Sequence, residues 1–212
     1  MQELCIRTNG AGQRLDKFLG KYMNQAPKSF LYKMMRKKNI ILNGKKASGT
    51  EMLSEGDVVK LFLSEETIGK SSRMPESTAV KAAMEQYTKL DILYEDEHAL
   101  FNNKPAGMLS QKASPKDVSL VEYLTAYLLT EGKITEEELK TFHPSVCNRL
   151  DRNTSGIVVA GKSLAALQEL TAMFRERTIK EYYLWLVKGI VTEEEKISGY
   201  LVKNEKATTV SV

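Results

Sequence analysis

The sequence predicts an α+β fold, in which a small helix–hairpin unit precedes a larger body built on a mixed, mainly antiparallel sheet with flanking helices. Apolar residues recur at helical spacing in some segments and form short strand-like runs in others. These segments follow one another without the regular strand–helix alternation of a doubly wound sheet. The 212 residues are 42% hydrophobic and 27% charged, which is ordinary globular usage and allows a packed core.

Two short helices are expected near the start of the chain. Residues 14–24 carry apolar side chains at helical spacing, and Pro27 ends this segment. Ser29 is expected to cap a second helix. The spacing turns Leu31, Met34 and Met35 of the second helix inward, and Lys33, Arg36 and Lys37 outward.

A β-hairpin and a strand complete the first unit. Asn43-Gly44 is a strong hairpin signal, because both residues tolerate the positive φ that a two-residue turn requires. A second turn over 55–57 leads into the apolar run 58–63, which predicts a strand. The two helices, the hairpin and the strand therefore predict a compact first domain over residues 1–64.

The rest of the chain divides into a linker and a second domain. Residues 65–89 are rich in Ser, Thr, Lys and Glu, and we expect a linker with a weak helix around 80–86. The second domain, 90–212, is expected to begin with paired strands over 92–94 and 99–101. Its other expected elements are a turn over 104–107, helices over 119–128, 135–140 and 163–174, strands over 157–160 and 182–187, and a strand pair within 197–212.

Basic residues gather in one segment of the first domain. The chain has 31 Lys and Arg against 27 Asp and Glu, a net charge of +4, yet residues 14–47 hold ten basic residues and one acid, Asp16. This segment carries +9 and the remainder −5. Clustered cations favour a polyanion such as RNA because they release its counterions, although a charge run can also be a solvated surface. The expected RNA-binding residues are Arg14, Lys17, Lys33, Arg36, Lys37, Lys45 and Lys46.

Composition argues against several classes of protein. Cys5 and Cys147 are too few for a disulfide framework and suit a reducing, cytoplasmic compartment. The sequence contains no run of about 18 apolar residues, so we expect no membrane-spanning helix. The N-terminus lacks the pattern of a signal peptide. His98 and His143, even with the two cysteines, are too sparse for a metal site. We therefore expect a cytoplasmic monomer with no membrane partner and no metal.

The segment 148–156 stands out as a candidate for chemistry. It is a polar loop containing Arg149-Leu150-Asp151, and it leads directly into the apolar run 157–160. Catalytic side chains are often presented on loops that a rigid scaffold positions. The alternative is that Arg149 and Asp151 form an ordinary loop ion pair beside a turn, and the residues alone leave both interpretations open.

This segment resembles the H-R-L-D-x-x-T-S-G motif of the RluA/RluC/RluD family of RNA pseudouridine synthases. Leu93-Tyr94-Glu95-Asp96 followed by Lys104-Pro105-Ala106-Gly107 resembles the family's opening motif, and Lys180-Glu181-Tyr182 followed by Val187-Lys188-Gly189 resembles a later strand motif. Residues 1–64 resemble the ribosomal-protein-S-four-like RNA-binding domain that many members carry. By this resemblance residues 90–212 are the N-terminal part of the catalytic domain.

The resemblance implies isomerisation of specific uridines to pseudouridine in RNA, ribosomal RNA in particular, after base flipping and without a cofactor or metal. It assigns Asp151 as the catalytic carboxylate, either as a nucleophile at the sugar or as an aid to cleavage of the glycosidic bond. Tyr182 would stack on the uracil and accept a proton, while Tyr183 and Trp185 are expected to be core aromatic residues. Arg149 would hold the RNA open around the flipped nucleotide.

The chain departs from the family pattern at two places. Asn148 stands where the family usually has His, and nothing after Gly189 matches the family's R-x-H-Q-I-R motif, whose basic residue pairs with the catalytic Asp. We therefore expect a truncated synthase. Two alternatives stay open: an RNA-binding protein without catalysis, and a synthase that acts on transfer RNA.

Overall fold

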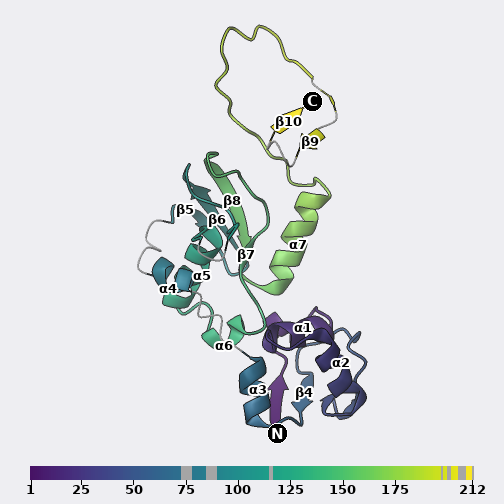
Figure 1. Cartoon of the computed structure of the whole chain (residues 1–212). Coiled ribbons are helices and arrows are strands. Elements are labelled where there is room, and N and C mark those ends of the chain that lie inside the picture. Colours follow the sequence, from purple (N-terminus) through teal and green to yellow (C-terminus); the bar gives the residue numbers. More distant parts are fainter. Residues whose placement is uncertain are drawn as a thin grey trace. The chain divides into compact units, whose positions relative to one another are not determined.

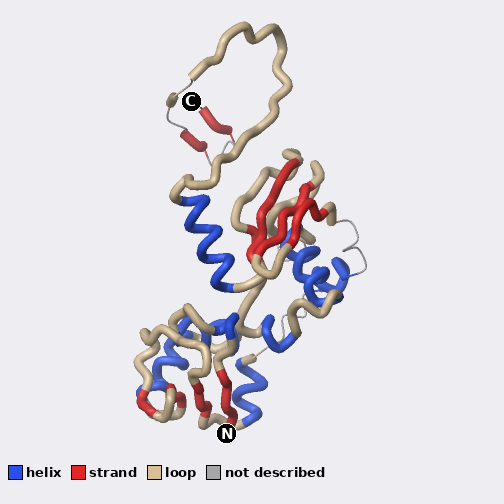
Figure 2. The backbone as a smooth tube through the Cα atoms, turned by 180° about the vertical axis from the view of Figure 1, so that it is seen from behind, coloured by secondary structure: helices blue, strands red, loops and turns tan. Residues whose placement is uncertain are grey.

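The computed structural model has an α+β fold with antiparallel sheets, as the sequence predicts. Two compact units make up the chain, residues 1–179 and residues 180–212. Figures 1 and 2 show the helices and strands of each unit. The structure describes residues 1–72, 78–84, 90–114, 117–196, 198–199, 202–204 and 209–211.

The first sheet has four antiparallel strands in the order β1 (Gln2–Cys5), β4 (Val58–Leu61), β2 (Ile40–Leu42) and β3 (Lys45–Lys46). The predicted hairpin joins β2 to β3, with positive φ at both Asn43 and Gly44. The predicted strand 58–63 is β4, shortened to Leu61. Sequence reasoning missed β1, whose residues lack the β-branched and aromatic side chains that mark a strand.

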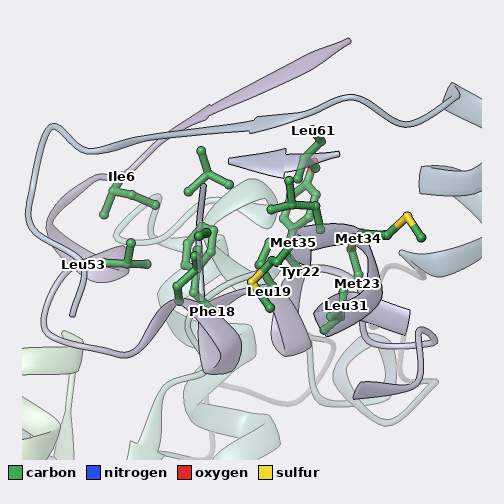
Figure 3. Packing of buried hydrophobic residues seen from close by; sticks show 14 of the residues in the cluster. Ile6, Phe18, Leu19, Tyr22, Met23, Leu31, Met34, Met35, Leu53 and Leu61 are labelled. Carbon is green, nitrogen blue, oxygen red and sulfur yellow. The ribbon is translucent and has the colours of Figure 1, made fainter. Parts of the chain in front are cut away.

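Helices α1 (Leu15–Tyr22) and α2 (Lys28–Arg36) pack their apolar stripes into the first core, and a 3-10 turn, η1 (Thr8–Gly10), precedes them. Figure 3 shows Phe18, Leu19 and Leu31 among the buried side chains. The prediction that Ser29 caps α2 is wrong. Pro27 occupies the N-cap with φ −60°, and its carbonyl accepts the first helical hydrogen bonds, so the helix is already under way at Ser29.

Two short helices occupy much of the expected linker. Helix α3 (Glu65–Ser71) begins at Ser64, whose side-chain oxygen accepts from the backbone N–H of Thr67, and Ile68 packs into the first core. Helix α4 (Thr78–Met84) overlaps the weak helix predicted over 80–86, of which residues 85 and 86 lie outside the described residues. The boundaries 1–64, 65–89 and 90–212 stay a prediction.

The second sheet also has four antiparallel strands, in the order β5 (Ile92–Glu95), β6 (Ala99–Lys104), β8 (Gly156–Gly161) and β7 (Ser145–Val146). It confirms the predicted strand pair and the strand at 157–160, although the side chain of Ile157 is exposed. Helices α5 (Leu120–Thr130), α6 (Glu136–Leu139) and α7 (Leu164–Arg175) lie where the sequence predicts helices.

Local capping signals set the starts of these helices. Glu122 accepts hydrogen bonds from the backbone and hydroxyl of Ser119 at the start of α5. Thr135 and Ser163 accept backbone hydrogen bonds at the starts of α6 and α7. Apolar residues of α5, the start of α7 and strands β6 and β8 then form a second core, separate from the first.

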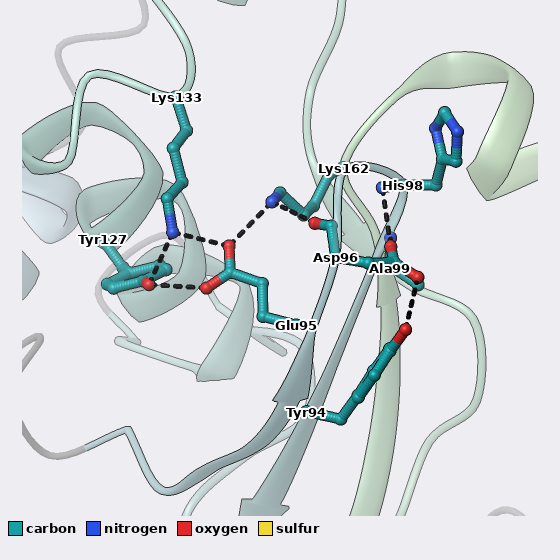
Figure 4. A network of polar contacts seen from close by, with 8 residues as sticks. All are labelled: Tyr94, Glu95, Asp96, His98, Ala99, Tyr127, Lys133 and Lys162. Carbon is teal, nitrogen blue, oxygen red and sulfur yellow. Dashed lines mark hydrogen bonds and ion pairs between the residues drawn. The ribbon is translucent and has the colours of Figure 1, made fainter.

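The carboxylate of Glu95 connects three parts of the second core (Figure 4). It accepts hydrogen bonds of 2.7 Å from Lys133, from Lys162 and from the hydroxyl of Tyr127. Burial works to raise the pKa of Glu95, but these three hydrogen bonds outweigh burial and lower that pKa to about 2.

The predicted strand 182–187 is wrong. Residues 180–191 have no helix or strand, and the side chains of Leu184, Leu186 and Trp185 are exposed. Tyr183 is exposed as well, so the expectation that Tyr183 and Trp185 are core residues is also wrong. A strand needs a neighbouring strand for its backbone groups, and none of the described residues pairs with this run. The strand pair expected within 197–212 is present as β9 (Val202–Asn204) and β10 (Thr209–Ser211).

Candidate functional site

The candidate catalytic loop, residues 147–155, joins β7 to β8. Asn148 fixes its start, because the side-chain amide accepts from the backbone N–H of Val159 at 2.8 Å and donates to the carbonyl of Ile157 at 3.2 Å. The side chain thus continues the hydrogen bonding of β8 after β7 ends. Both polar atoms of the Asn148 side chain therefore make hydrogen bonds to the backbone of β8.

Leu150 anchors the middle of the loop. Its side chain packs into the second core, and the hydroxyl of buried Ser110 donates to its carbonyl at 2.7 Å and accepts from its N–H at 3.0 Å. Arg149 and Asp151 flank this anchor, and both are exposed. The loop therefore presents a cation and a carboxylate to solvent from a fixed backbone.

Lys104 lies under the same loop with its side chain fully buried. Its ammonium group donates to the carbonyls of Met108 at 2.8 Å, Pro105 at 3.0 Å and Arg152 at 3.4 Å. Burial lowers the pKa of Lys104, and the negative charge of Asp151 works against that shift. A buried cation therefore holds the turn after β6 to the candidate loop and interacts electrostatically with Asp151.

The ion pair suggested for Arg149 and Asp151 is not formed. Within the described part of the chain, neither residue takes part in a salt bridge. The backbone carbonyl of Asp151 accepts from the N–H of Thr154, which closes a turn, while the carboxylate stays exposed. Both charged groups are thus accessible to a ligand.

Tyr182 belongs to the second compact unit, residues 180–212. Its side chain is 84% exposed and lies in a segment without regular secondary structure. The structure brings Arg149 and Asp151 together on one loop of the first unit, and it leaves Tyr182 on a separate unit.

The predicted RNA-binding residues are all exposed on α1, α2, the hairpin or the residues just beside them. Arg14 differs from the others, because its guanidinium makes two hydrogen bonds to Asp16, at 3.0 and 2.9 Å. That pairing balances its charge. No salt bridge between described residues involves Lys17, Lys33, Arg36, Lys37, Lys45 or Lys46.

Sequence reasoning missed Ser110 and understated Lys104. The residues of the chain carry no local signal for Ser110, because its partner Leu150 is forty positions away. In the sequence Lys104 is only part of the expected turn over 104–107, and its neighbours Asn102, Asn103 and Pro105 give no local signal that its charge is buried. The described residues hold no group of three His, Cys, Asp or Glu side chains placed to bind a metal ion. No helix in the described ranges has the length and apolar character to cross a membrane.

In sequence, this chain is similar to enzymes that modify RNA. A family model described as RNA pseudouridylate synthase matches residues 98–211. The ribosomal large subunit pseudouridine synthase C of Vibrio cholerae is 33% identical over 213 residues, which cover 100% of this chain and 64% of that protein. The Escherichia coli protein of the same name is 32% identical over 204 residues, covering 95% and 59%.

This chain thus spans less than two thirds of the length of the relatives that it matches. Among solved structures, human RNA pseudouridylate synthase domain containing 4 aligns with a TM-score of 0.36 and 21% identity, over 47% of this chain and 34% of that one.

Proposed function

The chain belongs to the RNA pseudouridylate synthase family, and on this premise we propose that it isomerises uridine to pseudouridine in RNA, with Asp151 as the catalytic carboxylate. The observation that carries the proposal is the match over residues 98–211, because it includes Arg149, Asp151 and Tyr182. The anchored loop supports it, since Leu150 and Lys104 hold the backbone on both sides of an accessible Asp151.

The reaction is an isomerisation, so its atoms balance without a co-reactant. The bond from N1 of uracil to C1′ of the ribose breaks, a bond from C5 to C1′ forms, C5 loses a proton and N1 gains one. Asp151 serves either as a nucleophile at C1′ or as a base that assists bond cleavage. Tyr182 stacks on the uracil and takes the proton from C5, and Arg149 contacts the RNA around the flipped nucleotide.

The substrate that we propose is ribosomal RNA of the large subunit. The relatives that match along the chain are named for that substrate, and the basic residues of α1, α2 and the hairpin give this chain a surface for RNA phosphates. Residues 1–64 would act as the RNA-binding domain and residues 90–212 as the catalytic domain, with residues 65–89 between them. The protein would work in the cytoplasm as a monomer.

A second candidate function is RNA binding without isomerisation. The observation that favours it is the exposure of Tyr182, which lies in a segment without helix or strand. In that case the basic surface would still bind RNA, and Asp151 would have no role. The two functions differ in one measurable product, pseudouridine.

The test is to map pseudouridine in large-subunit ribosomal RNA from cells that lack the gene and are complemented with this chain. We expect pseudouridine with the unchanged chain and none with Asp151→Asn, which keeps the shape of the side chain and removes its charge. Asp91→Asn is the matched control, because Asp91 is also an exposed acid and lies next to β5 rather than in the loop. Pseudouridine formed by the Asp151→Asn chain would refute the catalytic role. RNA binding by the unchanged chain with no pseudouridine would support the second function.

A further inference from the structure

A small pocket opens in the first domain, between the C-terminal half of α2 on one side and the end of β3 with the two residues that follow it on the other. Its volume is about 360 Å³, and it is lined by Tyr32, Met35, Arg36, Lys46, Ala47 and Ser48. Met35 and Ala47 are buried and form apolar walls with the ring of Tyr32, while Arg36 and Lys46 are exposed. The pocket thus combines an aromatic face with two cations.

The ring of Tyr32 is held in one orientation. Its hydroxyl donates to a carboxylate oxygen of Asp16 at 2.8 Å, and Arg14 holds the same carboxylate with two hydrogen bonds. The hydrogen bond to Asp16 raises the pKa of Tyr32 above its ordinary value of 10. A stacking surface that is already fixed loses little conformational entropy when a ligand binds.

The wall opposite the helix is fixed as well. Gly49 has φ +93°, and a Cβ atom there would lie 3.0 Å from Tyr32 Cε1 and 3.0 Å from Met35 Cε, so its backbone packs closely against the side chains of these two lining residues. Glu51 accepts hydrogen bonds from the N–H groups of Ser48 and Gly49, at 2.6 and 2.7 Å. These hydrogen bonds fix the conformation of the turn that follows β3.

We propose that this pocket binds one unpaired nucleobase of the RNA, which stacks on Tyr32 while its flanking phosphates contact Arg36 and Lys46. The inference rests on the proposed function in that the ligand is RNA. A base inside a helix has both faces stacked and its pairing edge engaged, whereas a bulged or looped-out base can present a face to an aromatic side chain. The domain thereby selects RNA helices that carry an unpaired nucleotide, in addition to attracting phosphates through its charge.

Binding of two labelled RNA hairpins by the chain tests the proposal. One hairpin is fully paired, and the other has the same stem with a single bulged adenosine. We expect the bulged hairpin to bind about 5- to 150-fold more tightly, because stacking of one base on an aromatic side chain has that effect on affinity. An abasic bulge keeps the phosphates and the kink but removes the base, and it should bind no more tightly than the paired hairpin.

Variants of the tyrosine identify the stacking surface. Tyr32→Leu should abolish the preference for the bulged hairpin and leave the affinity for the paired hairpin and its salt dependence unchanged. Tyr32→Phe keeps the ring and should keep most of the preference. Tyr94→Leu is the matched control, because Tyr94 also donates to an aspartate, Asp96, at 2.9 Å but does not line this pocket.

Three outcomes would refute the proposal that this pocket binds an unpaired base. They are equal binding of the bulged and paired hairpins by the unchanged chain, binding of the abasic bulge as tight as that of the adenosine bulge, and an undiminished preference for the bulged hairpin in a folded Tyr32→Leu chain. The abasic comparison needs no variant, so the proposal stays testable even where a variant fails to fold. Failure of the proposed function is seen separately, as the absence of pseudouridine from a chain that still prefers the bulged hairpin. Pseudouridine made by a chain without that preference would refute the pocket alone.

Discussion

At the scale of single residues, polar side chains on or near strand β6 differ widely in how many hydrogen-bond partners they have. Glu95 has three hydrogen-bond donors around one carboxylate, and Lys104 has three carbonyl acceptors around one ammonium group. Asn102 lies between them in chain order, on the same strand face as Lys104, and its buried amide has no hydrogen-bond partner within the described residues. The consequences of these differences can be measured.

Glu95→Gln should lower the free energy of unfolding at pH 7 by about 2 kcal/mol, because it removes a partly buried carboxylate whose three partners remain. The pKa of Glu95 is about 2 in the folded protein against an ordinary 4.5, so its contribution is complete above pH 4.5. As the pH falls toward 2, the unfolded chain takes up the proton first and the contribution disappears. Denaturation with urea at several pH values should show that the free energies of unfolding of the unchanged protein and of Glu95→Gln become equal as the pH falls toward 2.

Glu66→Gln is the control for this measurement, because the ion pair of Glu66 with Lys70 in α3 is exposed and contributes little to stability. It should leave the dependence of stability on pH as it is in the unchanged protein. A stability difference for Glu95→Gln that stayed constant down to pH 2 would contradict the lowered pKa.

Asn102→Leu should raise the free energy of unfolding by about 1–2 kcal/mol, because it replaces a buried amide that has no partner among the described residues by an apolar side chain of similar size. Asn103→Leu is the matched control, since Asn103 is exposed and donates to Asp91. It should bring no gain. Thermal unfolding of the three proteins gives the comparison, and a loss of stability in Asn102→Leu would mean that the amide is hydrogen-bonded in solution.

At the scale of whole elements, α2 shows how one helix serves packing and binding together. Leu31, Met34 and Met35 face the first core, and Arg36 and Lys37 face solvent. The 3.6-residue period of the helix separates these two functions by position alone. The exposed side is therefore free to change in charge without disturbing the core.

Charge reversal of Arg36 and Lys37 to Glu should weaken RNA binding and lower the slope of log affinity against log salt by roughly two, because each lost phosphate contact removes about one unit. The same reversal at Lys60 and Lys70 is the control, since both of these lysines are already paired with acids, Glu3 and Glu66. Filter binding over a range of salt concentrations measures both slopes. Equal salt slopes for the two double variants would contradict the assignment of Arg36 and Lys37 to the RNA-binding surface.

Segment 182–187 is the element in which an apolar sequence did not become a strand. Leu184 and Leu186 are fully exposed, so replacing both by Ser should change the free energy of unfolding by no more than about 0.5 kcal/mol. Leu124→Ser in the second core should cost more than about 2 kcal/mol, since Leu124 is buried. Chemical denaturation compares them, and a large loss in the Leu184 and Leu186 variant would show that the segment packs as the sequence predicted.

At the scale of the whole molecule, the described residues up to 179 form two hydrophobic cores with no residue in common. Hydrogen bonds connect the two regions, from the backbone N–H of Leu164 to Asn9 and from Gln168 to the carbonyl of Gly12. Polar links of this kind contribute less than a shared apolar core. We therefore expect the first core, which includes Ile68 of α3, and the second core to unfold as separate units.

Leu19→Ala should cost about 2–5 kcal/mol of stability in the first core, because it leaves a cavity at a fully buried position. Native-state hydrogen exchange should show loss of protection in α1 and β4, while β6 and β8 keep theirs. Leu124→Ala should give the reverse pattern. An equal loss of protection in both cores from either substitution would mean that they unfold as one unit.

The sequence by itself determined the elements whose signals lie within a few residues of one another. Asn43-Gly44 produced its hairpin, the apolar spacing of α1 and α2 marked their buried faces, and the ranges 119–128 and 135–140 marked two further helices. The antiparallel α+β class followed from the order of these elements. The family also followed from the sequence, because motif residues keep their order along the chain.

Only the tertiary structure decided features that depend on residues far apart in the chain. Ser110 anchors Leu150, Lys104 reaches the carbonyl of Arg152, and Tyr32 is oriented by Asp16. The segment around Tyr182 has strand-like composition, yet it is exposed because strand formation requires a partner that no local pattern can supply. Backbone turns and helix caps are short-range interactions, so local sequence predicts them, whereas the partner of a buried charge, a loop anchor or a strand is set by how the folded chain brings distant segments together.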